Sequence, residues 1–427
     1  MSQPTGRPPW ASPTNVDDDS PPLPQGEGAG GRGSIFIQNV RPLNGDPIDL
    51  RIADGLIAEA GPNLPHGPDE VIIDGGGRLL FPSFVDAHAH MDKTLLGMGW
   101  HRNEVGPSLL DKIENERAVR RERDIDYHEQ TLRQARLAIA VGTTHIRTFV
   151  DIDTEHGLAG FEGVMRTREE MRDALDIQVV AFPQSGMLAR PGTVELLERA
   201  LEEGAHVIGG LDPSTIDRDP KGHLDAIFGM AERFDVDVDI HLHEPGELGA
   251  FSVELIAERT RVLGWQGRVV ISHAFCLGGV DDAHYGRLVD LLLENDIAIM
   301  SHGPSGSVPI PPLKRLREAG VRMCTGNDGI RDAWGPLNMP DMLLRTFLVA
   351  YRNNLRRDDE IELVLDIATH GGARVIGAQV YGLRPGCAAD FVLVDGETHV
   401  EAVIERPARW LVVKRGRIVA REGTCLL

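Results

Sequence analysis

The sequence predicts an α/β protein in which a closed (β/α)8 barrel (TIM barrel) carries a small β-sandwich domain built from both ends of the chain. Two observations support this fold class. Eight short apolar segments alternate with helix-like stretches through the middle of the chain, which is the pattern of parallel βαβ units. The two ends instead hold β-like segments separated by Gly and Pro turns. An open doubly wound sheet is the alternative, but no G-x-G-x-x-G sequence follows a predicted strand.

The first end begins with residues 34–40, which alternate in polarity and are rich in β-branched side chains. The other β-like segments of the two ends are residues 48–52, 56–60, 70–74, 389–394, 400–404, 410–414 and 416–420. We predict that residues 34–80 and 381–427 form one β domain and that residues 81–380 form the barrel. Residues 1–33 are rich in Pro, Gly, Ser and Asp with almost no aliphatic side chains, so we predict a disordered tail.

Each predicted barrel strand is a largely apolar run with a polar residue near its end. The eight strands are residues 79–88, 144–151, 176–183, 206–211, 236–243, 268–274, 297–302 and 321–328. Helix-like stretches between them include residues 195–201 and 285–295. The charged run at residues 111–129 is predicted to be a solvated helix face.

The composition narrows the class of protein. The 427 residues carry a formal net charge of −21, from 65 acidic and 44 basic residues, which disfavours a nucleic-acid partner. No apolar stretch reaches the length of about 18 residues that a membrane span needs. The four cysteines form no C-x-x-C pair, and the first residues lack the features of a signal peptide. We therefore predict a cytoplasmic protein without a disulfide framework, a membrane span or a nucleic-acid partner.

Polar residues follow the predicted strands at their carboxyl ends, where barrels of this type hold their active sites. His88 and His90 end the first strand two positions apart, so their side chains share a face. The polar residues at the ends of the other strands include His241, His243, Glu244, His273, His302 and Asp328. Burying so many imidazoles at one rim without a ligand is costly, which indicates a metal site.

Three imidazoles and one carboxylate, with one position left for water, fit a catalytic Zn²⁺ or Fe²⁺ ion. The candidate ligands are His88, His90, His241 and Asp328. Strand geometry alone does not distinguish His241 from His243. A divalent metal lowers the pKa of bound water from about 15.7 toward about 7. In such a site Asp328 would take a proton from the water, Glu244 would exchange one with a substrate ring nitrogen, and His273 would steady the attacking hydroxide.

These residues and their neighbours resemble the amidohydrolase superfamily over about residues 34–427. The motifs that carry the resemblance are His88-Ala89-His90, His241-Leu242-His243-Glu244, Ser272-His273, Asn327-Asp328 and the stretch from Gly386 to Leu393. Within the superfamily, residues 91–94, 145–151 and 179–186 resemble the cytosine deaminase group. Residues 209–213 and 328–334 are also similar to N-isopropylammelide isopropylaminohydrolases, which remove an alkylamine from a triazine.

The resemblance implies one divalent metal ion, either zinc or iron. Its ligands would be His88, His90, His241 and Asp328. The resemblance further implies that Glu244 and His273 are acid/base residues and that Gln184 contacts the amide edge of the substrate. Binuclear members need a bridging carboxylated lysine after the fourth strand, and no lysine lies between Lys112 and Lys221. A mononuclear site is therefore expected.

Two features bear on the substrate. The H-x-x-E spacing of His241 and Glu244 favours the cytosine deaminase side, because the triazine enzymes carry an aspartate at the glutamate position. Gly329 stands where cytosine deaminases usually have an acidic residue, so we expect a wider pocket that admits a substituted ring such as 5-methylcytosine or a triazine. Arg331 and Asp332 are expected to pair with each other, with substrate contact as the alternative.

We therefore predict a metal-dependent hydrolytic deaminase of an aminated heterocycle, with cytosine or a substituted cytosine as the default substrate and ammonia as a product. The alternative on the same fold is an aminohydrolase that removes an alkylamine from an N-alkylated triazine. An alternative of another class is a non-catalytic barrel scaffold, which the complete ligand set disfavours. A small heterocycle is the predicted partner, and we expect a homo-oligomer.

Overall fold

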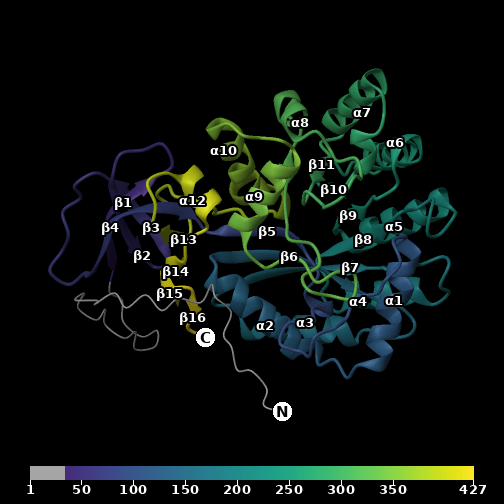
Figure 1. Ribbon diagram of the computed structural model, residues 1–427, viewed down its shortest axis with the longest axis horizontal. Helices are drawn as coiled ribbons and strands as arrows, with labels where there is room; N and C mark the ends of the chain where they lie inside the picture. The colour runs from purple at the N-terminus through teal and green to yellow at the C-terminus, as the bar shows by residue number, and fades with distance from the viewer. Residues whose placement is uncertain (1–33) are drawn as a thin grey trace, which may run out of the picture.

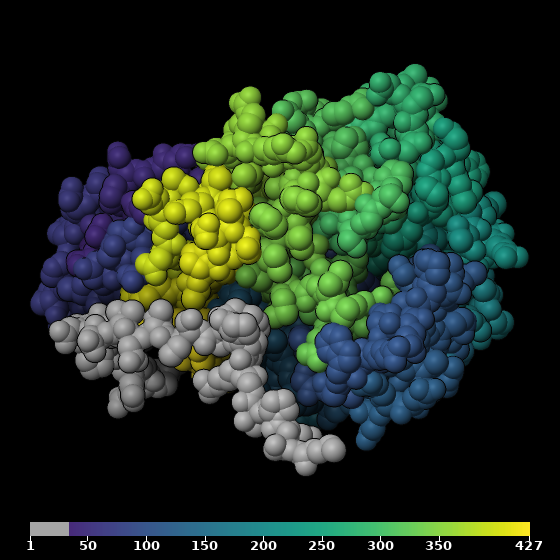
Figure 2. Space-filling model, in the orientation of Figure 1, coloured from purple at the N-terminus to yellow at the C-terminus, as the bar shows by residue number. Residues whose placement is uncertain are grey.

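The computed structural model of the protein describes residues 34–427, and the predicted disordered tail, residues 1–33, lies outside the described residues. Two eight-stranded sheets organise the fold. Figure 1 shows them side by side: the two ends of the chain, purple and yellow, form one unit, and the blue to green middle forms the other. The space-filling view in Figure 2 shows the same two units in contact.

One sheet is a parallel barrel, which confirms the predicted (β/α)8 fold. Its strands, in chain order, are β5 (Phe84–Ala89), β6 (Thr143–Asp151), β7 (Asp176–Phe182), β8 (Val207–Leu211), β9 (Asp237–His241), β10 (Val269–Ser272), β11 (Ala298–Met300) and β12 (Met323–Cys324). The barrel closes between β12 and β5, where the Ala87 amide donates to the Thr325 oxygen at 3.1 Å. The Asp328 amide also donates to the His88 oxygen at 2.8 Å. Gly326 is required at this junction, because a Cβ there would overlap the backbone of His88.

Helices cover the outside of the barrel (Figure 1). They are α1 (Leu109–Glu122), α2 (Tyr127–Ala140), α3 (Ala159–Glu170), α4 (Thr193–Glu202), α5 (Pro220–Phe234), α6 (Gly246–Leu263), α7 (Asp282–Glu294), α8 (Leu313–Ala319), α9 (Met342–Arg352), α10 (Asp358–Asp366) and α11 (Gly372–Ile376). Asp126, Asp219 and Asp281 begin three of them, each accepting a hydrogen bond from a first-turn amide. The aliphatic side chains between helices and strands form the main hydrophobic core. Across residues 34–427, every helix is too short or too polar to cross a membrane.

The other sheet draws its strands from both ends of the chain, as predicted. Its strands are β1 (Ile35–Pro42), β2 (Ile48–Ala53), β3 (Leu56–Gly61), β4 (Val71–Pro82), β13 (Phe391–Val394), β14 (Arg409–Lys414), β15 (Arg417–Arg421) and β16 (Thr424–Cys425). β4 pairs with β1 on one side and with β13 on the other, so it joins the two ends. The sheet folds back on itself, since the Ile57 amide of β3 donates to the Cys387 oxygen just before β13 at 2.9 Å. A separate apolar cluster fills the space between its layers.

Three sequence predictions differ from the structure. Residues 400–404 form helix α12 (His399–Glu405) instead of a strand, because their buried side chains follow a helical spacing and Thr398 caps the first turn. The predicted strand 79–88 is divided at Ser83 between β4 of one sheet and β5 of the other. The solvated face predicted for residues 111–129 is wrong for Glu116 and Arg120, which are buried. The domain limits remain predictions.

Candidate active site

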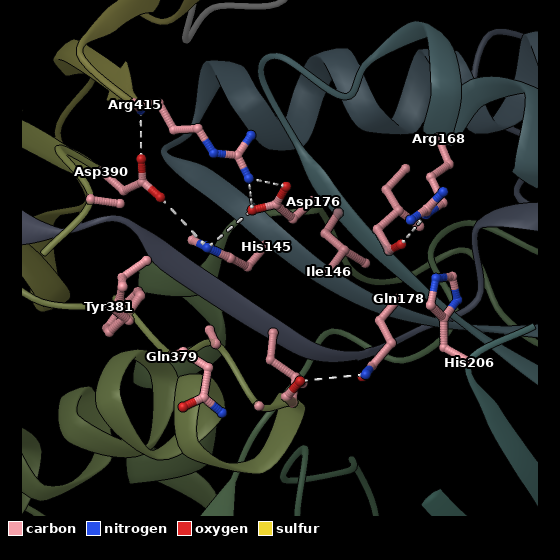
Figure 3. A pocket seen from close by; sticks show the side chains of 16 residues that line it. His145, Ile146, Arg168, Asp176, Gln178, His206, Gln379, Tyr381, Asp390 and Arg415 are labelled. Atoms are coloured by element: carbon pink, nitrogen blue, oxygen red, sulfur yellow. Dashed lines mark hydrogen bonds and ion pairs between the residues drawn. The ribbon is translucent and has the colours of Figure 1, made fainter. Parts of the chain in front are cut away.

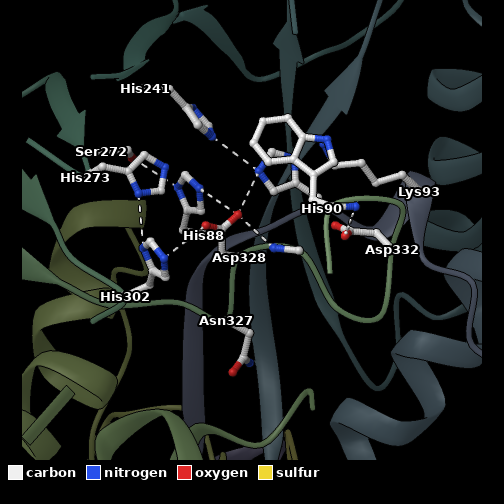
Figure 4. Close-up of polar contacts among 12 residues, drawn as sticks. His88, His90, Lys93, His241, Ser272, His273, His302, Asn327, Asp328 and Asp332 are labelled. Carbon is white, nitrogen blue, oxygen red and sulfur yellow. Dashed lines mark hydrogen bonds and ion pairs between the residues drawn. The ribbon is translucent and has the colours of Figure 1, made fainter. Parts of the chain in front are cut away.

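The predicted ligands converge at the carboxyl end of the barrel (Figure 4). His88 and His90 lie at the end of β5, and His241 ends β9. The His90 Nε2 atom lies 3.3 Å from His241 Nε2 and 3.3 Å from Asp328 Oδ1. The His88 Nε2 atom lies 3.9 Å from the same oxygen of Asp328. His88, His90 and His241 therefore form one group of potential ligands, and His88, His273 and Asp328 form a second group that overlaps it at His88, although His88 and Asp328 are 240 residues apart in the sequence.

This arrangement fits a single metal ion that is bound by four side chains and has a fifth position open to water. With metal–nitrogen distances near 2.0–2.1 Å, neighbouring ligand atoms around one ion lie about 3–3.5 Å apart, which matches the spacing around His90. The three imidazoles each offer a ring nitrogen within 4.8 Å of the others. The buried Nε2 atom of His88 has no hydrogen-bond partner among the described residues, and His241 Nε2 meets only another imidazole nitrogen, that of His90, so the donor set is incomplete without a ligand. His88, His90, His241 and Asp328 would hold the ion.

A hydrogen-bond chain behind His88 orients its ring. Arg147 Nη1 donates to Asp239 at 2.9 Å, and the Ser272 hydroxyl donates to the other oxygen of Asp239 at 2.7 Å. The hydroxyl proton is therefore engaged, so the contact of 3.1 Å between Ser272 Oγ and His88 Nδ1 requires the imidazole to donate. That tautomer leaves the lone pair of His88 Nε2 free. Such support is typical of histidines that bind metals.

The electrostatics of the cluster also favour metal binding. Burial lowers the pKa of His88, His241 and His273 well below the usual histidine value, so the rings are neutral and keep a lone pair. Burial alone would raise the pKa of Asp328, but interactions with the surrounding histidines, His302 first among them, bring it well below the ordinary value. Asp328 is therefore a carboxylate.

Two residues of this cluster hold the backbone in the left-handed region. Asp328 has a φ of 62° and His273 has a φ of 72°, although neither is a glycine. This conformation is unfavourable for a residue with a side chain and is found where the surrounding structure enforces it, often at functional sites. The sharp turn at each position directs the side chain toward the carboxyl end of the barrel. Figure 4 shows both side chains beside His88.

A cavity of about 1060 Å³ opens above the cluster. Its floor includes His90, His241 and Asp328. Further lining residues include Lys93, Gln184, His243, His302, Asp332 and Trp334. The helix α9 and the loop before it contribute the apolar or aromatic side chains of Leu337, Met339, Leu344, Leu348 and Tyr351, together with Asn338, Arg345 and Arg352. The cavity therefore has room for a heterocycle and an apolar substituent.

The structure places the two predicted acid/base residues differently. His273 lies beside His88, and its Nε2 atom has no partner. Glu244 is buried but does not line the cavity: its carboxylate accepts the amides of Ser214 and Thr215 at 2.8 and 2.7 Å and the Ser252 hydroxyl at 2.6 Å. Burial raises the pKa of Glu244. The predicted proton donor is thus held by the loop after β8.

His243 faces the cavity where Glu244 does not. Its Nδ1 atom lies 2.7 Å from Asp212 Oδ2, and its ring stacks on His273 with centroids 4.4 Å apart. The pairing of His243 with Asp212 was not predicted, although His243 shares a strand face with His241. Asp212 follows β8 directly, and its amide donates to the His241 oxygen on the neighbouring strand, so its position after the strand could have indicated the contact.

Gln184 lines the cavity, and its amide nitrogen donates to Glu116 at 3.4 Å; its contact with the substrate remains a prediction. Lys93 Nζ also bonds to Glu116, at 3.3 Å, and lies 5.2 Å from the centre of the Trp334 ring. The sequence pattern did not indicate Glu116 or Trp334 as residues of the site. Their roles depend on α1 packing against the mouth of the barrel, which sequence pattern does not show.

Gly329 does not leave an open space. A Cβ at this position would overlap Oδ2 of Asp332, so the carboxyl group of Asp332 already occupies that volume. The expectation that Gly329 widens the pocket is therefore wrong at this point. The expected ion pair between Arg331 and Asp332 is also absent among the described residues: the Arg331 guanidinium lies over Trp100, and Asp332 faces the cavity near Lys93.

Comparisons with known proteins agree with this geometry. Residues 71–420 match the Amidohydrolase family. The chain is 32% identical over 358 residues to N-isopropylammelide isopropyl amidohydrolase of Pseudomonas sp. (strain ADP), covering 82% of this chain and 88% of that protein. The structure of N-isopropylammelide isopropylaminohydrolase from Burkholderia multivorans superposes with a TM-score of 0.90 and 47% identity, covering 92% of this chain and all of that one. The structure of 5-methylcytosine deaminase from Klebsiella pneumoniae superposes with a TM-score of 0.81 and 28% identity, covering 91% and 97%.

The fold and the site together define a barrel hydrolase whose polar cluster lies at the carboxyl ends of the strands. The chain belongs to the amidohydrolase family, as its motifs suggested, and is a hydrolase of carbon–nitrogen bonds.

Proposed function

We propose that this protein is a mononuclear metal-dependent aminohydrolase that removes an alkylamine from a hydroxylated, N-alkylated aminotriazine. The observation that carries this choice over cytosine is the apolar part of the cavity wall, to which α9 and the loop before it contribute Leu337, Met339, Leu344 and Leu348. A bare pyrimidine ring would leave that wall uncovered, whereas an N-alkyl group would bury it. The names of two relatives, at 47% and 32% identity, support the same substrate class.

The chain supplies the groups that the hydrolysis needs. A divalent ion held by the four proposed ligands would polarise a water molecule and lower its pKa toward about 7. Asp328 is placed to accept a proton from the attacking water, and His302 Nε2, 3.4 Å from Asp328 Oδ2, supports the carboxylate. His273 has a free ring nitrogen to hydrogen-bond the attacking oxygen. Gln184 and Lys93 bind the polar edge of the ring.

Departure of the amine requires a proton at a ring or exocyclic nitrogen. We assign this proton to Glu244, whose pKa is raised by burial. To reach the substrate its side chain must release the Ser252 hydroxyl. His243, whose Nδ1–H group donates to Asp212, remains on the cavity wall with Nε2 as a hydrogen-bond acceptor for the substrate.

A Glu244→Gln variant tests this assignment. The amide oxygen still accepts the Ser214 and Thr215 amides, so the loop after β8 stays in place. We expect kcat to fall by about 100-fold or more, the usual contribution of a general acid. A Ser252→Ala variant is the matched control, because it removes only the bond that holds the carboxylate back. Full activity of Glu244→Gln would leave Glu244 with an anchoring role only.

Deamination of 5-methylcytosine or cytosine is the second candidate. It is favoured by the glutamate at position 244 and by the similarity to 5-methylcytosine deaminase. The two candidates differ in the amine that is released, which is an alkylamine in one case and ammonia in the other.

The deciding experiment presents metal-loaded protein with N-isopropylammelide, other N-alkylated hydroxytriazines, cytosine and 5-methylcytosine, and identifies the released amine by mass spectrometry. We expect alkylamine release, and none from a His241→Ala control. Ammonia release from the pyrimidines alone would favour the second candidate. No release from any compound, with metal bound, would contradict the proposed function and favour the scaffold.

A further inference from the structure

Asp332 lies beside the candidate metal ligands without belonging to them. It is buried, lines the cavity, and follows Asp328 by four residues (Figure 4). Its Oδ1 atom accepts hydrogen bonds from the backbone amides of Trp334 and Gly335, at 2.8 and 3.1 Å. These two bonds fix the carboxyl group in one orientation.

The second oxygen of Asp332 is unused. Among the described residues, none donates a hydrogen bond to Oδ2. Its position depends on Gly329, because any side chain at 329 would begin where Oδ2 now lies. Gly329 itself lines the cavity directly after Asp328. Because Gly329 has no side chain, the Oδ2 atom of Asp332 reaches the edge of the reaction site.

Within residues 34–427, the charged groups around Asp332 leave its Oδ2 atom without a hydrogen-bond donor. Lys93 is the nearest cation, but its ammonium group is hydrogen-bonded to Glu116. Burial raises the pKa of Asp332, Lys93 opposes this and Glu116 adds to it, so the pKa is about 6. At neutral pH the group is a carboxylate that lines the cavity, and its Oδ2 atom has no donor among the described residues, so a ligand in the cavity can donate to it.

We propose that Asp332 is a specificity-determining residue that accepts a hydrogen bond from an N–H group of the heterocycle through Oδ2, in the space that Gly329 leaves. This inference rests on the proposed function, since it names a substrate contact of the same site. It selects rings that present an N–H beside the reacting carbon and rejects rings that carry an N-methyl group or an unprotonated acceptor there.

Binding measurements test the contact without requiring turnover. Cyanuric acid, the ring that remains after the amine is replaced by a hydroxyl, and its N-methylated form are titrated into metal-loaded wild type and Asp332→Asn. The asparagine keeps an oxygen for the Trp334 and Gly335 amides but places an amide donor at Oδ2. We expect N-methylation to weaken binding to the wild type by about 10-fold to 100-fold, and to make little difference in the variant. Equal discrimination by both proteins would overturn the proposal.

A transplanted carboxylate separates recognition from structure. In the Gly329→Asp/Asp332→Gly double variant the carboxylate starts from position 329 and can fill the same volume. We expect Asp332→Gly alone to lose discrimination against N-methylated rings and the double variant to recover at least part of it. If Asp332 only holds the 332–335 turn, the second substitution restores nothing. Metal content and melting temperature, measured for each variant, identify any that fail to fold.

Kinetics distinguish failure of this inference from failure of the proposed function. If the wild type releases an amine and Asp332→Asn has the same kcat/KM, the Asp332 contact is wrong while the proposed function stands. If the wild type releases no amine but N-methylation still weakens binding only when Asp332 is present, the contact stands and the proposed reaction fails.

Discussion

The barrel buries histidine next to carboxylates at both of its ends, and the two clusters differ in how their polar atoms are used. At the amino end, Lys414 Nζ donates to Asp176 and Asp390 at 2.7 and 2.8 Å and lies 3.2 Å from His145 Nε2. The other ring nitrogen of His145 contacts the Thr144 hydroxyl at 3.1 Å. Figure 3 shows His145 between the two aspartates. This cluster is complete within the chain.

The carboxyl end is incomplete by the same measure. Buried ring nitrogens of His88, His241 and His273 have no partner. The cavity at the carboxyl end is also the larger of the two, with a volume of about 1060 Å³ against about 280 Å³ beside His145. Unpaired polar atoms cost free energy unless a ligand binds them. Between these two clusters, unpaired nitrogens and not histidine as such therefore mark the difference, and the following substitutions test it.

The largest expected effect is on catalysis, from His241→Ala. It removes one of the proposed metal ligands, and activation of water by the metal supplies several kcal/mol of the barrier. We expect metal content to fall and kcat/KM to drop by roughly 1000-fold or more. Metal analysis and steady-state kinetics with the best substrate of the panel measure both.

The matched substitution at the other end is His145→Ala. It removes a buried histidine of similar environment, so it controls for the loss of an imidazole. We expect unchanged metal content and unchanged turnover per folded molecule, with lower stability. Loss of metal from His145→Ala, or its retention in His241→Ala, would contradict the division between the two ends.

The next effect is on stability, from Lys414→Met. Lys414 is fully buried, and its removal leaves Asp176 and Asp390 without their shared cation. Breaking a buried ion pair in this way typically costs 3–5 kcal/mol, so we expect a loss of about 3 kcal/mol or more in chemical denaturation. Lys314→Met is the control, because Lys314 pairs with Glu360 on the surface and should matter by less than about 1 kcal/mol. Equal effects from the two lysines would show that the amino-end cluster is not structural.

Much of the fold and of the candidate site could be predicted from the sequence. Apolar runs that end in polar residues predicted all eight barrel strands, including β12, because parallel strands are buried on both faces. The convergence of His88, His90, His241 and Asp328 followed from the rule that carboxyl ends of barrel strands meet. The role of these residues as ligands, and the predicted cytoplasmic location and homo-oligomer, remain predictions.

Other features depend on tertiary contacts that no local pattern encodes. The carboxylate of Glu244 bonds to a loop thirty residues earlier in the chain, so its spacing from His241 did not show its direction. The burial of Glu116 depends on Lys93 and Gln184, which come from other segments. A turn between Gly329 and Asp332 brings the Asp332 carboxyl group into the space beside Gly329. In the sequence, Arg331 and Asp332 suggested an ion pair, with substrate contact as the alternative.

Burial of histidine makes stability depend on pH, and His145 at the amino end provides a clear case. Burial, and then Lys414, lower its pKa to about 4, against Asp390 and Asp176, which raise it. The unfolded chain takes up this proton near pH 6.5 and the folded protein only near pH 4, so stability falls as pH falls between these values. The full difference is about 3 kcal/mol at 1.36 kcal/mol per unit. The stability of wild type and His145→Gln, measured from pH 7.5 to 4, should converge toward the acid side; parallel curves would exclude this contribution.

The smallest expected effects come from two hydroxyl groups, one at each end. Thr144→Val removes the contacts to His145 and Ser83, so it should destabilise the protein by about 1 kcal/mol and leave metal affinity unchanged. Ser272→Ala removes the group that orients His88, so it should weaken metal affinity by about 10-fold to 100-fold. Denaturation curves and metal competition with a chelator measure both quantities for both variants. If Thr144→Val weakened metal binding as much as Ser272→Ala, the hydroxyl behind His88 would have no special role, and the free Nε2 atom of that ring would need another explanation.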